Sequence, residues 1–304
     1  MNIKTTTLLT ILVTFALSCK SVAAEENGLL WRISGNGLTQ SSYLFGTHHM
    51  VPVSFLETVS GLSEAFESTQ QVVGELDMSN PAAMMQLQIQ MMHYALMPEG
   101  VTYHQLLSED DIYLLDNTLT DLLGVGLAQF GTFNPAMLSY LISLTRMAQY
   151  FPEMAEGTSI DQYFQEQAVL RSRPVRALDT VESQLHAMFG ISTVERQAEL
   201  LVCMLHHPDE ARELMERVNE LYYAFDLMGL YAMAMEEEEN SPCPSTDEER
   251  HALTRDRHLR CIDRLSEIIQ EKSSFIAVGA LHLPGEYGLI EGLRRAGFTV
   301  TAVQ

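Results

Sequence analysis

The sequence predicts an α/β fold with a central, mostly parallel sheet, which is formed by strand–helix–strand segments at both ends of the chain and interrupted by a large helical insertion. Three observations predict this fold. Short apolar runs bounded by turn residues occur near both ends, and helical periodicity fills the middle. The composition, with 46% hydrophobic and 19% charged residues over 304 positions, is that of a globular chain and excludes a disordered or collagen-like one.

The N-terminal strands are expected at three apolar runs. Leu29–Ile33 and Ser42–Phe45 flank the turn residues 34–37, and Gln71–Leu76 forms the third run. Between the second and third runs, apolar residues recur every three to four positions and predict one amphipathic helix through Leu56, Val59, Leu62 and Phe66.

The C-terminus repeats this plan, with strands expected at Phe275–Val278 and Phe298–Val303 around a helix through residues 289–295. Strand–helix–strand connections predict right-handed crossovers and parallel pairing. Residues 81–269 are expected to be mainly helical, interrupted by a short strand at Pro174–Leu178. We therefore expect a single domain over residues 25–304, in which 25–80 and 270–304 form the α/β shell.

The first 24 residues are expected to be a signal peptide. Lys4 precedes the apolar run Leu8–Leu17, and Val22-Ala23-Ala24 supplies the small residues of a cleavage site. So short a run cannot cross about 30 Å of hydrocarbon as a helix, so no permanent membrane span is expected. A lipoprotein anchored at Cys19 is the weaker alternative, because Leu17 lies one position later than the leucine of a lipobox. We expect an exported protein, either periplasmic or secreted.

The charge and the cysteines narrow the function classes. With 40 acidic and 18 basic residues, the net charge of −22 disfavours nucleic-acid binding and the binding of anionic substrates. Cys203, Cys243 and Cys261 lack the Cys-x-x-Cys spacing of a zinc or redox site. Two alternatives stay open: a disulfide between Cys243 and Cys261, or free buried thiols.

Candidate functional residues follow the predicted strands at both ends. Residues 46–49 and 279–282 share a Gly-x-x-His pattern, which places His49 and His282 on loops at the strand ends, and Glu75 lies at the end of the third strand. Loops that leave the carboxyl ends of parallel strands form the ligand crevice of an open sheet. Adjacent His48 and His49 should point opposite ways, so only one should face that crevice.

Two imidazoles and one carboxylate suit a divalent metal ion with open positions. Such an ion would lower the pKa of a bound water and polarise a substrate carbonyl. The alternative interpretation is that both histidines are turn residues bonded to backbone carbonyls.

Other charged residues suggest supporting roles. Asp179 ends the predicted central strand, and with Asp161 and Glu182 it could ligate, accept a proton or orient a ligand histidine. Arg257 is a candidate for binding a substrate carboxylate or polarising a carbonyl. Its alternative role is a helix-surface salt bridge with Asp256 or Asp263.

Several of these segments resemble the TraB/GumN family, whose relatives include the TIKI metalloproteases and the pheromone-shutdown proteins. The opening of the family is matched by Leu30–Ile33, Ser42–His49 and Val73–Asp77, and its end by Phe275–Val300. The middle is matched by Thr158–Asp161, Pro174–Gln184 and Arg255–Arg257. The paired Gly-x-x-His motifs are the most specific part of the resemblance.

The resemblance implies a fold similar to the haem-binding ChaN and erythromycin-esterase proteins. It also implies a protease that depends on a manganese- or cobalt-type ion, with His49, His282 and Glu75 at the site. Three positions depart from the family pattern: His48 replaces an apolar residue, His258 stands where Asn is common, and Asp179 stands where Glu is common.

The leading hypothesis is an exported metal-dependent hydrolase, acting on a peptide or small-molecule substrate. A divalent ion on His49, Glu75 and His282 would activate water, with Arg257 or Asp179 assisting in positioning or proton transfer. Two alternatives are a non-catalytic protein that sequesters haem or a peptide, and an esterase in which a crevice histidine is the general base without a metal.

Overall fold

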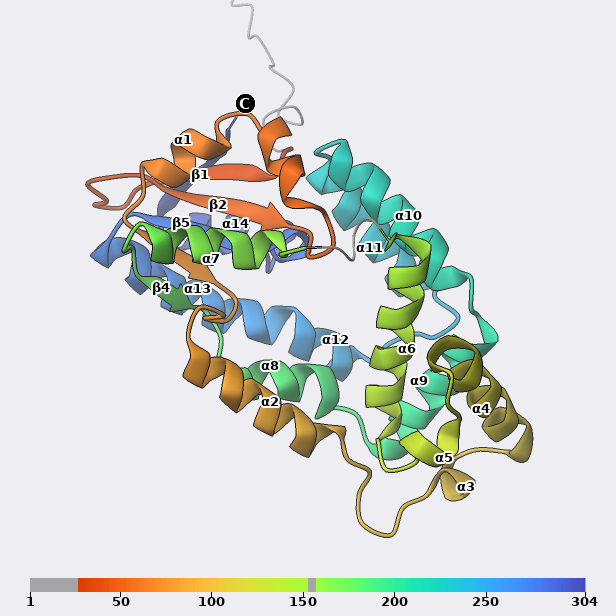
Figure 1. Ribbon diagram of the computed structural model, residues 1–304. Helices are drawn as coiled ribbons and strands as arrows, with labels where there is room; N and C mark the ends of the chain where they lie inside the picture. The colour runs from red at the N-terminus through yellow and green to blue at the C-terminus, as the bar shows by residue number, and fades with distance from the viewer. Residues whose placement is uncertain (1–26, 153–156, 304) are drawn as a thin grey trace, which may run out of the picture.

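The computed structural model describes residues 27–152 and 157–303, and Figure 1 shows their arrangement. The predicted signal peptide, residues 1–24, lies outside the described residues. The α/β prediction is confirmed: a six-stranded sheet with its covering helices forms one part of the molecule, and a helical part adjoins it. In the described residues, no helix is both long and apolar enough to cross a membrane.

The sheet has the strand order β4-β3-β5-β2-β1-β6. The strands are β1 (Leu30–Gly35), β2 (Ser42–Thr47), β3 (Gln71–Gly74), β4 (Val175–Ala177), β5 (Ser274–Gly279) and β6 (Phe298–Ala302). Strands β4, β3, β5 and β2 pair in parallel, whereas β1 is antiparallel to both β2 and β6. The strands around each predicted crossover helix run in the same direction, as expected, but β5 lies between β2 and β3, and β6 pairs with β1 rather than with β5.

The two Gly-x-x-His segments begin on neighbouring strands. Tyr43 of β2 lies opposite Phe275 of β5, and Thr47 lies opposite Gly279. The loops that carry His49 and His282 therefore leave the same edge of the sheet, although more than 230 positions separate them in the sequence. This is the proximity that the repeated motif predicted.

Helices cover both faces of the sheet. The helices of this part are the 3-10 helices η2 (Val53–Thr58) and η4 (Ala280–His282) and the α-helices α1 (Leu62–Glu67), α7 (Ile160–Leu170), α13 (Arg255–Glu271) and α14 (Leu289–Arg295). On one face Phe164 of α7 stacks on Phe275 of β5 with 4.6 Å between ring centroids. On the other face Val278 of β5 packs with Cys261 of α13 and Leu289 of α14.

The single helix predicted through Leu56 and Phe66 is two elements in the structure. Gly61 precedes α1 with φ = 71°, a left-handed conformation that ends the helical path and that glycine adopts at little cost. Periodicity alone does not reveal such a break, because the apolar spacing continues across it.

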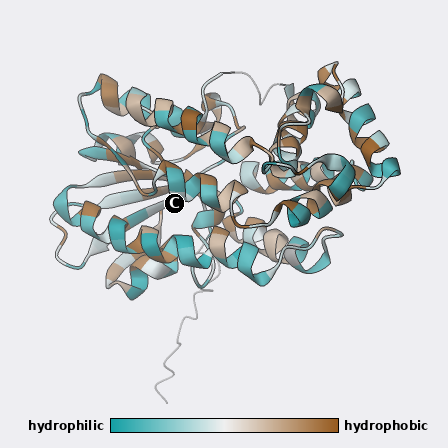
Figure 2. Ribbon diagram, turned by 90° about the horizontal axis from the view of Figure 1, so that it is seen from below, coloured by the Kyte–Doolittle hydropathy of each residue, from teal (hydrophilic) through white to brown (hydrophobic). Residues whose placement is uncertain are grey.

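The helical part contains the remaining helices. They are α2 (Pro81–Ala95), α3 (Tyr103–Leu106), α4 (Glu109–Leu123), α5 (Leu127–Phe130), α6 (Pro135–Tyr150), α8 (Val181–Phe189), α9 (Val194–His206), α10 (Glu210–Tyr223), α11 (Leu227–Asn240) and α12 (Asp247–Leu253). Helices α4, α6 and α9 enclose a second apolar core that includes Leu119, Leu138 and Leu201, each fully buried. Figure 2 shows hydrophilic and hydrophobic residues mixed along these helices, as expected where each packs on one face.

One disulfide joins two segments of this helical part. Cys203 of α9 is bonded to Cys243, which lies between α11 and α12, with 5.8 Å between their Cα atoms. Among the described cysteines Cys261 is free and buried. The predicted Cys243–Cys261 bridge is therefore wrong, because Cys261 faces the core between α13 and the sheet.

Candidate active site

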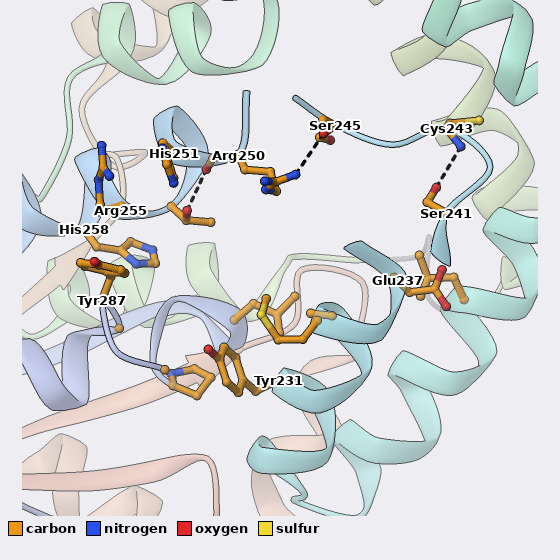
Figure 3. Close-up of a pocket in the computed structure, with 18 of the residues that line it drawn as sticks. Tyr231, Glu237, Ser241, Cys243, Ser245, Arg250, His251, Arg255, His258 and Tyr287 are labelled. Atoms are coloured by element: carbon orange, nitrogen blue, oxygen red, sulfur yellow. Dashed lines mark hydrogen bonds between the residues drawn. The ribbon is translucent and has the colours of Figure 1, made fainter. Parts of the chain in front are cut away.

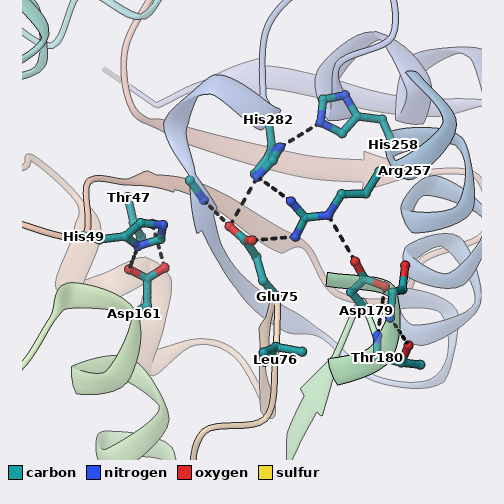
Figure 4. Close-up of polar contacts among 12 residues, drawn as sticks. Thr47, His49, Glu75, Leu76, Asp161, Asp179, Thr180, Arg257, His258 and His282 are labelled. Atoms are coloured by element: carbon teal, nitrogen blue, oxygen red, sulfur yellow. Dashed lines mark hydrogen bonds and ion pairs between the residues drawn. The ribbon is translucent and has the colours of Figure 1, made fainter. Parts of the chain in front are cut away.

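The carboxyl ends of the four parallel strands carry the candidate site (Figure 4). His49 follows β2, Glu75 follows β3, Asp179 follows β4 and His282 follows β5. Helix α13 adds side chains from its first turn. The structure therefore brings the predicted residues to one edge of the sheet, where an open parallel sheet places its ligands.

Glu75 is held by three neighbours. Its Oε1 accepts a hydrogen bond from the backbone N–H of Gly279 at 3.0 Å, and its Oε2 accepts one from Arg257 Nη2 at 2.7 Å. His282 Nε2 lies 3.4 Å from Oε1. Burial alone would raise the pKa of Glu75, but the hydrogen bond and charge of His282 and the charge of Arg257 hold that pKa well below its ordinary value.

Arg257 joins two carboxylates. Besides its bond to Glu75, its Nε donates to Asp179 Oδ2 at 3.1 Å, and only 11% of its side chain is exposed. The alternative of a surface salt bridge with Asp256 or Asp263 was wrong for this arginine, because Asp256 pairs with Arg255 instead. Arg257 thus fixes Glu75 and Asp179 at the ends of adjacent strands.

His258 and His282 share a short hydrogen bond, with 2.7 Å between His258 Nε2 and His282 Nδ1. Burial, together with the charges of His282 and Arg257, lowers the pKa of His258 to about 4, so its ring is neutral at pH 7. In the tautomer in which His282 Nδ1–H is the donor to His258, the lone pair of the His282 ring lies on Nε2. This Nε2 lies 3.4 Å from both Arg257 Nη1 and Glu75 Oε1.

His49 forms a second pair with Asp161, which lies in the first turn of α7. The ring donates from Nδ1 to Asp161 Oδ2 at 2.7 Å, and Thr47 donates to the other carboxylate oxygen at 2.7 Å. Asp161 is buried, whereas 64% of the His49 side chain is exposed. The hydrogen bond from His49 to Asp161 raises the pKa of His49 to about 9, so its ring is cationic at neutral pH.

The two adjacent histidines differ in exposure: His48 is partly buried and His49 is exposed. The His48 ring packs edge-on against Tyr222, with 5.3 Å between ring centroids, and burial lowers the pKa of His48 to about 4. The Tyr222 hydroxyl in turn donates to the carbonyl of Gly46 at 2.9 Å. His48 therefore supports the loop, and His49 is the residue that a substrate could reach.

The predicted metal ligands do not meet at one point as the side chains are placed. In the part of the chain that the structure describes, no group of three or more His, Cys, Asp and Glu side chains is arranged to hold a metal ion. Figure 4 shows His49 paired with Asp161, apart from Glu75 and His282, while the Arg257 guanidinium lies against those two. This arrangement does not fit an ion, and the ligand role of His49, Glu75 and His282 stays a prediction.

Sequence reasoning missed the role of His258. It treated this residue only as a departure from a family pattern, yet its ring positions His282. The one available signal was its position next to Arg257, because no motif spacing links His258 to His282. Asp161 does orient a crevice histidine, one of the roles predicted for it, whereas Glu182 is exposed.

Comparison with known proteins identifies one family. The model of the TraB/PrgY/gumN family matches residues 29–302, nearly the whole described chain. No curated protein and no solved structure matches the sequence.

Proposed function

Because the chain belongs to the TraB/PrgY/gumN family, we propose that it is a hydrolase with peptides as its first substrate class. One observation carries the proposal: two histidines, each oriented by a side-chain partner, lie with an acid and an arginine at the carboxyl edge of the sheet. This is the combination of base, acid and charge-stabilising groups that hydrolysis of an acyl bond requires.

His282 is the general base in this proposal. In the tautomer in which its Nδ1–H donates to His258, its Nε2 carries a lone pair. This Nε2 lies 3.4 Å from Arg257 Nη1, so in the proposal a water must enter beside Arg257 for Nε2 to take its proton. Once protonated, Nε2 faces Glu75 Oε1 at 3.4 Å, and the carboxylate stabilises the imidazolium. Glu75 thus stabilises the imidazolium from the side of the nitrogen that takes the proton, whereas His258 holds the ring by Nδ1.

His49 is the general acid. Asp161 holds the ring by Nδ1, which leaves its Nε2–H open to a substrate. A cationic imidazole can polarise the substrate carbonyl and then protonate the leaving group. Opposite environments thus separate the roles of the two histidines, a pattern common to acid–base pairs in enzymes.

Arg257 and Asp179 are positioning residues. A backbone hydrogen bond already joins Glu75 to Asp179, and Arg257, which donates to both side chains, holds the two carboxylates in place. Its charge also keeps Glu75 ionised, which the base mechanism requires.

The test is cleavage of a mixed peptide library, and of small esters, by the wild type and three variants. His282→Gln and His49→Gln should each lower kcat at least 100-fold while the folded structure is retained. His104→Gln, which changes an exposed histidine of α3, is the matched control and should retain full activity. Full activity in either site variant would refute the proposal, and saturable binding of a peptide or haem without products would support a sequestering protein instead.

Metal dependence is a separate part of the proposal, implied by the resemblance. A manganese- or cobalt-type ion would require His49, Glu75 and His282 to converge. Elemental analysis of protein never exposed to chelator, followed by chelation and addition of Mn²⁺, decides between a metal-dependent mechanism and one that uses the histidines alone. Activity that chelation removes and Mn²⁺ restores supports the metal-dependent form, whereas unchanged activity supports chemistry by the histidines alone.

The proposal also places this activity outside the cytoplasm, on the basis of the predicted signal peptide. Fractionation of expressing cells, with N-terminal sequencing of the exported protein, tests it. A mature chain that begins at Glu25 supports cleavage after Ala24, and an uncleaved chain recovered from the cytoplasm refutes export.

A further inference from the structure

A cavity of about 730 Å³ adjoins the candidate site (Figure 3). It lies among α10, α11, α12 and the segment 281–288 that follows β5. His258 lines this cavity and also bonds His282 at 2.7 Å, so one ring belongs to both the cavity and the site. A group held in the cavity would contact His258 and Leu281, the neighbours of the proposed general base, rather than His282 itself.

Apolar side chains form much of the cavity wall, and beside His258 the wall also carries His251 and Arg255. Its apolar side chains include Leu281, Pro284 and the rings of Tyr231 and Tyr287, and Ala234 and Met235 of α11 extend it. A volume of this size with a mainly apolar wall and a few polar groups is typical of a substrate cavity.

Two features hold the cavity in shape. Gly285 has φ = 88°, and a Cβ built there would lie 2.7 Å from the Tyr231 ring, so the ring packs directly on the backbone. At the other end, Cys243 of the wall is tied to Cys203 of α9 by the disulfide. The cavity is thus formed before a substrate arrives, which lowers the entropy lost on binding.

We propose that this cavity takes a bulky apolar side chain of the substrate, next to the bond that the site cleaves. The inference rests on the proposed hydrolase function and deepens it, because it assigns a preference for large apolar residues. The shared ring of His258 carries the argument: a side chain in the cavity positions its own carbonyl near His282.

Narrowing the cavity tests the preference. Ala234→Leu and Ala211→Leu each add a branched side chain to the wall from a helix, where leucine is nearly as favourable as alanine. Ala232→Leu is the matched control, because Ala232 is an exposed residue of the same helix as Ala234. The readout is the ratio of kcat/KM values for two peptides that differ only in Phe or Ala at one position.

The wild type should favour the Phe peptide by about 10-fold to 200-fold. Both cavity variants should reduce that ratio at least tenfold, and the control should leave it unchanged. A ratio unchanged in both cavity variants would overturn the inference.

A binding measurement separates this inference from the proposed activity. Titration with 8-anilinonaphthalene-1-sulfonate, followed by fluorescence, should show one saturable site in the wild type and in Ala232→Leu. The dissociation constant should rise at least tenfold in Ala234→Leu at an unchanged melting temperature. If no peptide is cleaved but this result is obtained, the cavity assignment holds and the hydrolase proposal fails; if the affinity is the same in all three proteins, the cavity assignment fails.

Discussion

Glu249 joins α12 to the region between α8 and α9, and its replacement by glutamine tests how much one buried acid contributes to stability. The residue is 8% exposed, and its carboxylate accepts hydrogen bonds from Ser192 Oγ at 2.5 Å, Arg196 Nε at 3.3 Å and the Thr246 backbone N–H at 2.8 Å. Helix α12 forms part of the cavity wall, so this contact also anchors that wall.

The magnitude follows from the pKa of Glu249. Burial by itself would raise this pKa, but the hydrogen bonds from Ser192 and Thr246 and the pairing with Arg196 lower it from 4.5 to about 2. A group whose folded pKa is lowered contributes stability that is present above its unfolded pKa and is lost as the pH falls through the folded pKa. The difference between 4.5 and about 2 corresponds to about 3 kcal/mol above pH 5.

Urea unfolding followed by circular dichroism measures this contribution. Glu249→Gln should lower the free energy of unfolding by about 3 kcal/mol at pH 7, and the difference from wild type should fall below about half of that at pH 3. The matched control is Glu199→Gln, because Glu199 pairs with the same arginine at 3.2 Å but is 67% exposed. The control should cost at most about 1 kcal/mol. Equal losses in the two variants, or a loss for Glu249→Gln that does not change with pH, would refute the reasoning.

Three further predictions concern the site and the disulfide. Asp161→Asn should let the pKa of His49 fall from about 9 toward 6.5, which NMR titration of the ring measures, and should lower kcat at least tenfold. Replacing Cys203 and Cys243 by serine removes a link across a sequence separation of 40 residues and should cost about 2–4 kcal/mol in urea unfolding, matched by reduction of the wild type. Arg257→Met leaves two carboxylates without their cation, so we expect a loss of about 3–5 kcal/mol at neutral pH that shrinks in acid; a loss that is the same at pH 4 and pH 7 would contradict this cause.

Much of the sheet could be predicted from the sequence, because strands buried on both faces appear as short apolar runs between turn residues. Strands β3 and β5 lie within two residues of their predicted bounds. The site edge could be predicted for the same reason, since the repeated motif placed His49 and His282 at ends of parallel strands.

The remaining features depend on contacts that spacing does not encode. The pairing of β6 with β1, the break at Gly61 and the partner of Cys243 are decided by how elements pack in three dimensions. His258 is a further case, because its role arises only when α13 brings its ring against a loop from a different strand.

The position of β5 has a consequence for how the chain reaches its native state. This strand lies between β3 and β2, yet it begins at Ser274, near the end of the chain. A nascent polypeptide released only to residue 273 would lack the middle of its sheet, and its first two parallel strands would have no common neighbour. Such long-range pairing slows folding, so the sheet can be assembled only after residues 274–279 have been synthesised.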